Sequence, residues 1–200
     1  MSYIQRVFWI SFTAATAIYL VMVFWTMPTI SAAAGGLAPF DMRPFGYTPQ
    51  EARGFLSALT AEGRDFYITV QQRLDLVYPA LLGIMLIVGF QSLFPRPWSL
   101  VFSFVALIMV SADYLEYYMV ATMLHIGPDA VEDNLAAFAS SWTRCKSAAA
   151  TVASVGLMAG AVIPVRRRWA AHGPRLWRRL AVTGVVRMRG GGNGRGGGTN

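Results

Sequence analysis

The sequence predicts an all-α membrane protein, a four-transmembrane-helix bundle with an additional amphipathic helix at the membrane interface. Of its 200 residues, 55% are hydrophobic and only 14% are charged, whereas charged residues make up about a quarter of a soluble domain. The apolar residues gather in four runs, and a helix of roughly 20 apolar residues is long enough to cross a bilayer. Prolines, glycines and charged residues separate the runs.

The four predicted spans cover residues 7–27, 77–94, 98–124 and 140–165, and the long connection at 28–76 is polar. The alternative for the first run is a cleaved signal peptide, because small residues follow it. The apolar core of a signal peptide is usually about 7–15 residues. This run has 21 residues, so we favour a retained span.

The long connection contains a strong helix start at Thr48-Pro49-Gln50-Glu51. A threonine before the helix, a proline at its first position and a glutamate three residues after the threonine form a capping box. The helix that follows places apolar side chains on one face, namely Ala52, Phe55, Leu56 and Leu59. We expect this helix to lie on the membrane surface or on the end of the bundle. Asp41 and Arg43, among aromatic residues, suit an interfacial loop.

The basic residues predict the topology. Arg6, Arg96 and residues 166–168 lie on one side of the four spans, and the acidic loop at 129–133 lies on the other. Short loops rich in arginine and lysine stay in the cytoplasm. We therefore expect a multi-pass protein of the bacterial inner (plasma) membrane with both termini cytoplasmic.

The net charge of +7 comes from the C-terminal tail. Residues 166–200 hold nine arginines and no acid, while the rest of the chain holds ten acids and eight basic side chains. A basic helix at 175–189 would lie on an anionic leaflet, and the glycine-rich end from about 190 is typical of disorder. Since the basic character belongs to the tail, we expect no nucleic-acid partner.

Charged residues inside the spans form the candidate site. Counted at 1.5 Å per residue from the cytoplasmic end of each span, Glu116 lies at roughly 27 Å, and Lys146 and Asp75 lie at roughly 28 Å. Asp113 lies at roughly 22 Å, within a hydrocarbon core of about 30 Å. The sequence thus predicts a polar cluster of Asp75, Asp113, Glu116 and Lys146 near the outer face, because charges in hydrocarbon need partners or a function.

Three side chains are possible accessories of this cluster, namely Arg73, Tyr117 and Arg144. The cluster has two interpretations. It either holds the bundle in register through ion pairs or forms a polar pocket for a membrane lipid or a protein partner. Two further alternatives stay open: a small membrane enzyme that uses Asp113 or Glu116 as general acid or base on a lipid-like substrate, and a subunit of a proton-coupled carrier.

The sequence predicts neither a cofactor nor a metal. It contains one cysteine and two histidines and lacks the common nucleotide-binding, hydrolase and zinc motifs. Gly156 and Gly160 form a small-residue motif that permits close helix packing. We favour packing within one chain for this motif, with a homodimer as the alternative.

Four segments, in the order FDMRPFGYTPQEA, RLDLVYP, SADYLEYYM and WTRCKS, resemble those of small four-span bacterial inner-membrane proteins of unknown function. The resemblance covers about residues 7–165 and implies no activity. Four-span enzymes that reduce quinones or vitamin K are similar in size but use paired cysteines, and Cys145 is the only cysteine here. We therefore exclude that class.

Overall fold

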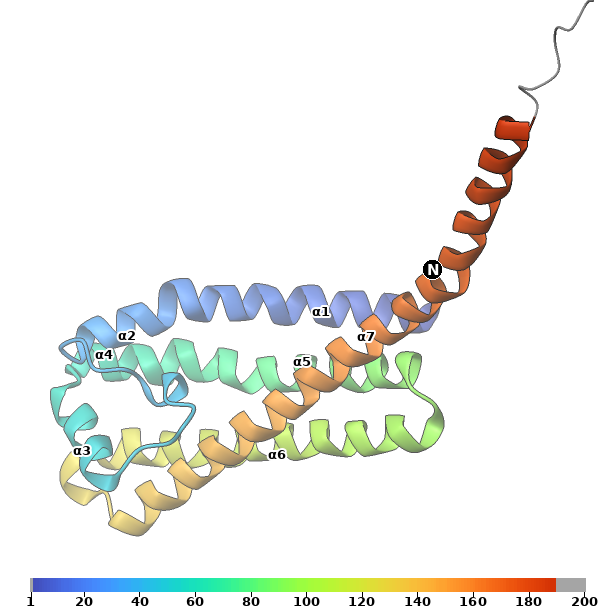
Figure 1. Cartoon of the computed structure of the whole chain (residues 1–200). Helices are drawn as coiled ribbons and strands as arrows, with labels where there is room; N and C mark the ends of the chain where they lie inside the picture. The colour runs from blue at the N-terminus through green and yellow to red at the C-terminus, as the bar shows by residue number, and fades with distance from the viewer. Residues whose placement is uncertain (1, 190–200) are drawn as a thin grey trace, which may run out of the picture. The chain divides into compact units, whose positions relative to one another are not determined.

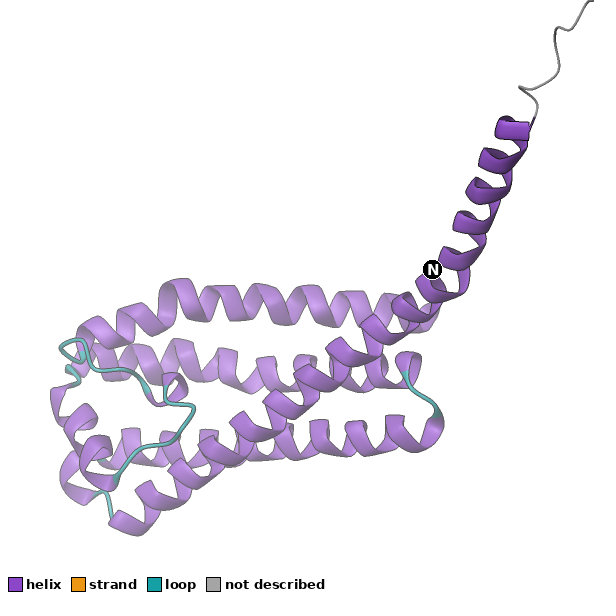
Figure 2. Cartoon of the chain, in the orientation of Figure 1, coloured by secondary structure: helices purple, strands orange, loops and turns teal. Residues whose placement is uncertain are grey.

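The computed structural model describes the backbone of residues 2–189 and the side chains of residues 2–162. This part of the chain consists of helices and loops and contains no strand (Figure 2). Four helices are long and apolar enough to cross a membrane, at Tyr3–Ala33, Ala61–Leu93, Arg96–Ile126 and Asp133–Val162. The predicted all-α fold with four membrane-crossing helices is confirmed, and by length and composition the chain is a multi-pass membrane protein.

Two of the long helices are interrupted by a π-helical turn. The first comprises α1 (Tyr3–Val21), a π turn (Met22–Thr26) and α2 (Met27–Ala33). The second comprises α4 (Ala61–Phe66), a π turn (Tyr67–Gln71) and α5 (Gln72–Leu93). The other two are α6 (Arg96–Ile126) and α7 (Asp133–Arg189). The connections hold short 3₁₀ turns at Phe40–Met42 and Pro128–Ala130 and the helix α3 (Pro49–Ala58).

By their contacts, the residues form two compact units, Met1–Met158 and Ala159–Asn200, and all packing described below lies within the first. There, α5 lies between α1 and α6 (Figure 1). A tight turn at residues 94–95 joins α5 to α6, and we call the end of the bundle that contains it the turn end. Residues 34–60, which we call the cap, join the first two long helices at the opposite end, the loop end.

The cap is folded onto the loop end of the bundle. Its helix α3 begins with the predicted capping box, in which Thr48 and Glu51 exchange hydrogen bonds. Arg53 of α3 donates to the carbonyl of Val131 and forms an ion pair with Asp133. Buried apolar residues of the cap pack against those of α6 and α7, among them Phe40, Phe55, Leu56, Val120, Met123, Leu124, Ala136 and Ala139. The predicted amphipathic helix therefore packs on the end of the bundle.

At the turn end the helices approach closely over small residues. A Cβ at Gly89 would lie 2.7 Å from Leu157, and one at Gly156 would lie 2.7 Å from the ring of Phe102. A second buried cluster lies here, formed by Met85, Leu86, Phe90, Ala106, Met109, Ala149 and Ala153. Gly156 thus serves packing within the chain, as favoured from the sequence.

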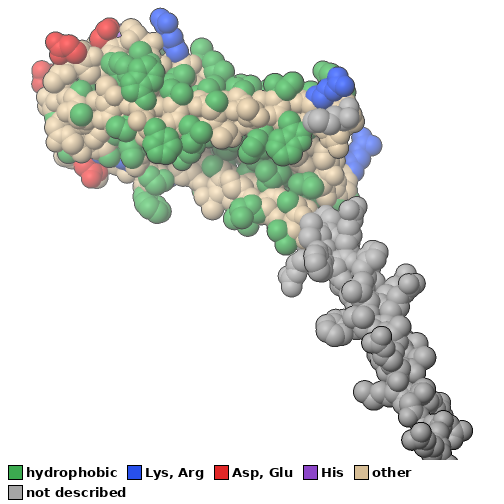
Figure 3. All heavy atoms as spheres, turned by 90° about the horizontal axis from the view of Figure 1, so that it is seen from above, with side chains coloured by type: hydrophobic (Ala, Val, Ile, Leu, Met, Phe, Trp, Pro, Cys, Tyr) green, Lys and Arg blue, Asp and Glu red, His purple; other side chains and the backbone are tan. Residues whose placement is uncertain are grey.

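The surface of this unit suits a bilayer. Large hydrophobic side chains are exposed along the helices, including Trp9, Phe24, Phe104 and Met158. On the face that Figure 3 shows, hydrophobic side chains lie along the length of this unit, while acidic side chains gather at the loop end. Lipid offers an apolar contact for such side chains, whereas water does not.

The structure differs from the sequence prediction for the long connection and does not describe the side chains of the predicted tail. The connection expected at 28–76 is largely helical, because α2 continues to Ala33 and α4 begins at Ala61. Pro28 does not end the first helix and stands in the first turn of α2, directly after the π turn. The glycine-rich end predicted to be disordered, at 190–200, and the side chains of the basic tail, at 166–189, lie outside the described residues.

Candidate functional site

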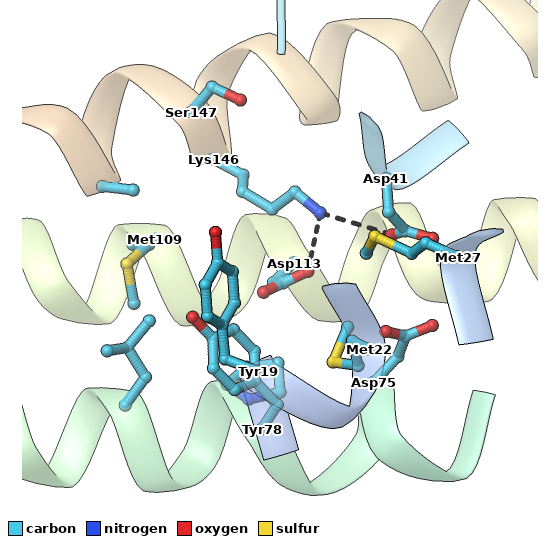
Figure 4. A pocket seen from close by; sticks show the side chains of 13 residues that line it. Tyr19, Met22, Met27, Asp41, Asp75, Tyr78, Met109, Asp113, Lys146 and Ser147 are labelled. Atoms are coloured by element: carbon cyan, nitrogen blue, oxygen red, sulfur yellow. Dashed lines mark hydrogen bonds and ion pairs between the residues drawn. The ribbon is translucent and has the colours of Figure 1, made fainter. Parts of the chain in front are cut away.

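Lys146 of α7 is the centre of the candidate site. Its Nζ lies 3.0 Å from Oδ1 of Asp113 and 3.8 Å from Oδ1 of Asp41 (Figure 4). It also forms an ion pair with Glu116. The side chains of Lys146, Asp113 and Asp41 are only 16–17% exposed, and that of Glu116 is 2% exposed. One ammonium group is therefore shared by three carboxylates in a region with little access to water.

Helical spacing explains how α6 and α7 build this arrangement. Asp113 and Glu116 are three residues apart on α6 and so project from one face. Thr143 and Lys146 are likewise three residues apart on α7, and Thr143 donates a 2.6 Å hydrogen bond to Oε1 of Glu116. Thus both oxygens of Glu116 are held by the same face of α7, as a buried carboxylate requires.

Asp41 comes from the cap and was missed as a site residue by sequence reasoning. Its Oδ2 accepts a 2.7 Å hydrogen bond from the Tyr67 hydroxyl, while Oδ1 faces Lys146. Arg43 is engaged elsewhere, donating to the carbonyl of Ala38 at 3.0 and 2.8 Å. Asp41 and Lys146 are far apart in sequence, and a loop has no periodicity that predicts a direction. The adjacent Phe40 is fully buried, so this part of the cap lies against the bundle, where Asp41 meets Tyr67 and Lys146.

Asp75 lies in the same region but has a different partner. Its Oδ1 accepts a 2.9 Å hydrogen bond from the side-chain amide of Gln71, whose Oε1 in turn accepts one from Thr26. Thr26 and Gln71 end the two π turns, so the turns are joined through their side chains. Among the described residues, no basic side chain lies within 4.0 Å of Asp75. The structure therefore places Asp75 beside the cluster without pairing it to Lys146.

A cavity of about 200 Å³ opens at this cluster. Its lining combines charged and apolar side chains from the four long helices and the cap, namely Tyr19, Met22, Met27, Asp41, Asp75, Tyr78, Pro79, Leu82, Met109, Asp113, Lys146, Ser147 and Ala150 (Figure 4). Pro79 cannot donate to the carbonyl four residues before it, which belongs to Asp75. We call this space the polar cavity.

A smaller inner cavity of about 10 Å³ lies beside it, lined by Asp41, Gln72, Asp75, Asp113, Glu116, Tyr117 and Val120. Gln72 is 5% exposed, and its side-chain amide nitrogen has no hydrogen-bond partner within the described protein residues. The volume is about that needed for one water molecule. A water there would satisfy the Gln72 donor and bridge it to a carboxylate.

The three predicted accessory residues differ in position. Tyr117 lines the inner cavity. Arg73 and Arg144 are exposed, and Arg144 donates only to Ser141, at 3.4 Å. Each arginine lies two residues from a cluster residue, and residues two apart on a helix do not share a face. The structure therefore does not bring either arginine into the cluster.

A buried phenol lies above the cluster in the cap. Burial is the main reason why the pKa of Tyr47 is raised well above its ordinary value, and the negative charge of Glu116 adds to the effect. The Tyr47 hydroxyl has no hydrogen-bond partner among the described residues, while its backbone N–H donates to Ser140 at 2.8 Å. The Tyr47 phenol is therefore neutral and adds no charge to the cluster.

The chemistry open to the site follows from its charges. Four carboxyl groups, those of Asp41, Asp75, Asp113 and Glu116, surround a single lysine, so their formal charges do not balance. A cationic ligand or protons would compensate for this excess in a medium of low dielectric constant. Within residues 2–162, no group of three or more histidine, cysteine or acidic side chains is arranged to hold a metal ion.

Comparison with known proteins identified no matching protein family, no matching curated protein and no matching solved structure. The resemblance to small inner-membrane proteins therefore remains a prediction from the sequence, and the function must be argued from the site.

Proposed function

We propose that this chain is an inner-membrane protein that binds a membrane lipid through the polar cavity near its outer face. The observation that supports this most is the mixed lining of the cavity. Charged groups converge at Lys146, and apolar and aromatic side chains form the remaining wall. A lipid presents the same combination of a polar head and an apolar body to a protein inside the bilayer.

The proposed orientation rests on the ends of the bundle. Arg6 and Arg96 lie at the turn end, and the exposed acids of the cap and of the α6–α7 connection lie at the loop end. By the positive-inside rule, the turn end and both termini are cytoplasmic. The polar cavity then lies toward the outer leaflet, below the cap.

Two features favour binding over the alternative functions. Asp113 and Glu116 are both engaged by Lys146, whereas a general acid or base needs access to the substrate proton. A carrier needs a polar route through the bundle, and the buried apolar cluster around Met85, Phe90 and Met109 lies on the turn-end side of the cavity.

The test is to purify the full chain from its native membrane in a mild neutral detergent and to identify retained molecules by mass spectrometry. We expect a lipid at near one per chain, and less of it in Asp113→Asn, which weakens the centre of the cluster. Asp65→Asn, at an exposed position on α4, is the matched control. Retention of no lipid by the folded wild type, or retention of a protein partner in its place, would contradict the proposal.

A further inference from the structure

An apolar groove continues from the polar cavity along α1 and α5. It is lined by Phe12, Ala15, Thr16, Tyr19, Tyr78, Leu82 and Met85 and has a volume of about 210 Å³. Three of these residues, Tyr19, Tyr78 and Leu82, also line the polar cavity. We call this space the α1–α5 groove. Since it contains no charged side chain, the two spaces together are apolar at one end and charged at the other.

The charged end favours a cation. The ammonium group of Lys146 already has three carboxylate partners, so it offers little to an anionic head group. Asp75 faces the same cavity with no basic partner within 4.0 Å among the described residues. An anion entering here would meet Asp41, Asp75 and Asp113, whereas an ammonium group would find in Asp75 a carboxylate that no basic side chain pairs with among the described residues.

One further observation favours a cationic head group at this place. Tyr19 and Tyr78 are stacked, with ring centroids 6.2 Å apart, where the cavity meets the groove. Aromatic faces attract ammonium groups, so the passage suits a cationic head as well as an alkyl chain.

From this geometry we propose that the occupant is a membrane lipid with an ammonium head group. Its ammonium lies in the polar cavity beside Asp75, and one of its alkyl chains lies in the α1–α5 groove. The volume of the cavity is many times the roughly 10–15 Å³ that a single water needs, so a small head group fits together with water. This inference rests on the proposed lipid-binding function. It adds the class of lipid and the orientation of the bound lipid, from the polar cavity to the α1–α5 groove.

Two lipids that differ only in the head group test the assignment. The full chain, delipidated in neutral detergent, is titrated with phosphatidylethanolamine or with phosphatidylglycerol of the same acyl chains, and binding is measured by native mass spectrometry. Both lipids carry the phosphate, but only the first carries an ammonium. We expect the first to bind about tenfold more tightly or better, the scale of a charge-assisted hydrogen bond.

Two variants, each with a matched control, locate the two ends of the lipid. Asp75→Asn should reduce the preference for phosphatidylethanolamine to about twofold or less, since the charge-assisted bond is lost, while the exposed Asp65→Asn keeps it. Thr16→Phe fills the α1–α5 groove and should weaken binding of both lipids. Thr13→Phe, on the exposed side of the same helix, should leave binding unchanged.

The outcomes separate this inference from the function on which it rests. Equal binding of the two lipids, preferred binding of phosphatidylglycerol, or an unchanged preference in a folded Asp75→Asn would overturn the ammonium assignment while lipid binding itself stands. Unchanged binding in a folded Thr16→Phe would overturn the assignment of the groove. Failure of the wild type to bind either lipid, or any lipid in the native extract, would overturn both proposals.

Discussion

The loop end and the turn end of the bundle are built in different ways. At the loop end, polar contacts cross between helices and cap, as at Lys146, and aromatic residues of the cap complete the core. At the turn end, contacts are apolar and close, with glycines placed against Leu157 and Phe102. In each of the two interrupted helices, the π turn lies nearer the loop end than the turn end. Such turns are frequent at functional sites.

This difference separates an end that carries buried charge from an end that is held by apolar packing. Lipid tails are as apolar as the side chains that pack at the turn end, so association there depends on shape and close contact. At the loop end, groups that cannot be left without partners in hydrocarbon must meet one another. A functional site is therefore expected at the loop end, and the turn end is expected to tolerate conservative apolar exchange.

The largest effect is expected from removing the centre of the ion pairs. Lys146→Met leaves three carboxylates without their cation and should lower the free energy of unfolding by about 3–5 kcal/mol. Unfolding in mixed micelles with increasing dodecyl sulfate measures it. Arg144→Met, which changes an exposed cation two residues away, should stay within about 0.5 kcal/mol of the wild type. Equal stability of the two variants would mean that the cluster does not hold the loop end together.

The next-largest effect is the loss of stability expected when a buried phenylalanine is truncated, and one such residue from each end of the bundle allows a comparison. Phe40 in the cap and Phe90 in α5 are both fully buried, and truncation of a buried phenylalanine in a protein core costs about 3–5 kcal/mol. We expect Phe40→Ala to reach that range, because the cap lies beyond the apolar spans and faces water. Phe90→Ala should cost less, because the bilayer offers no hydrophobic driving force between helices.

The same unfolding assay, together with hydrogen exchange of the α3 amides, distinguishes the two phenylalanine variants. Exchange of α3 should rise in Phe40→Ala and stay unchanged in Phe90→Ala. A loss in Phe90→Ala as large as that in Phe40→Ala would show that the two ends are stabilised by the same force.

The smallest effect concerns pH at the start of α3. Hydrogen bonds from the backbone and the side chain of Thr48 lower the pKa of Glu51 below its usual value of 4.5. A lowered pKa in the folded state means that the stabilisation is complete above about 4.5 and is lost as the pH falls through the lower folded value. Exchange of the α3 amides, corrected for intrinsic rates, should therefore rise below pH 4.5. Glu51→Gln should remove this pH dependence, and a dependence that survives in it would assign the effect to another group.

Much of the candidate site followed from counting residues along helices. Depth along each span placed Glu116, Lys146 and Asp75 at one level, with Asp113 somewhat deeper, and the structure pairs Lys146 directly with Glu116 and Asp113. The same count placed Asp75 in the cluster but did not reveal that its Oδ1 accepts a hydrogen bond from the side-chain amide of Gln71. The count by depth also grouped Arg73 and Arg144 with the cluster, but residues two apart on a helix do not share a face, and both arginines are exposed.

By itself, the sequence determined that this protein is a bundle of four membrane-crossing helices, where α3 begins, and which span positions carry charge. These properties depend on local hydrophobicity, helix period and capping chemistry, all of which act within about one helix. Only the tertiary structure decided that Asp41 of the cap joins Lys146, that Asp75 remains apart, and that a polar cavity adjoins an apolar groove. Those features depend on which faces of distant segments meet, and that is set by packing of the whole assembly.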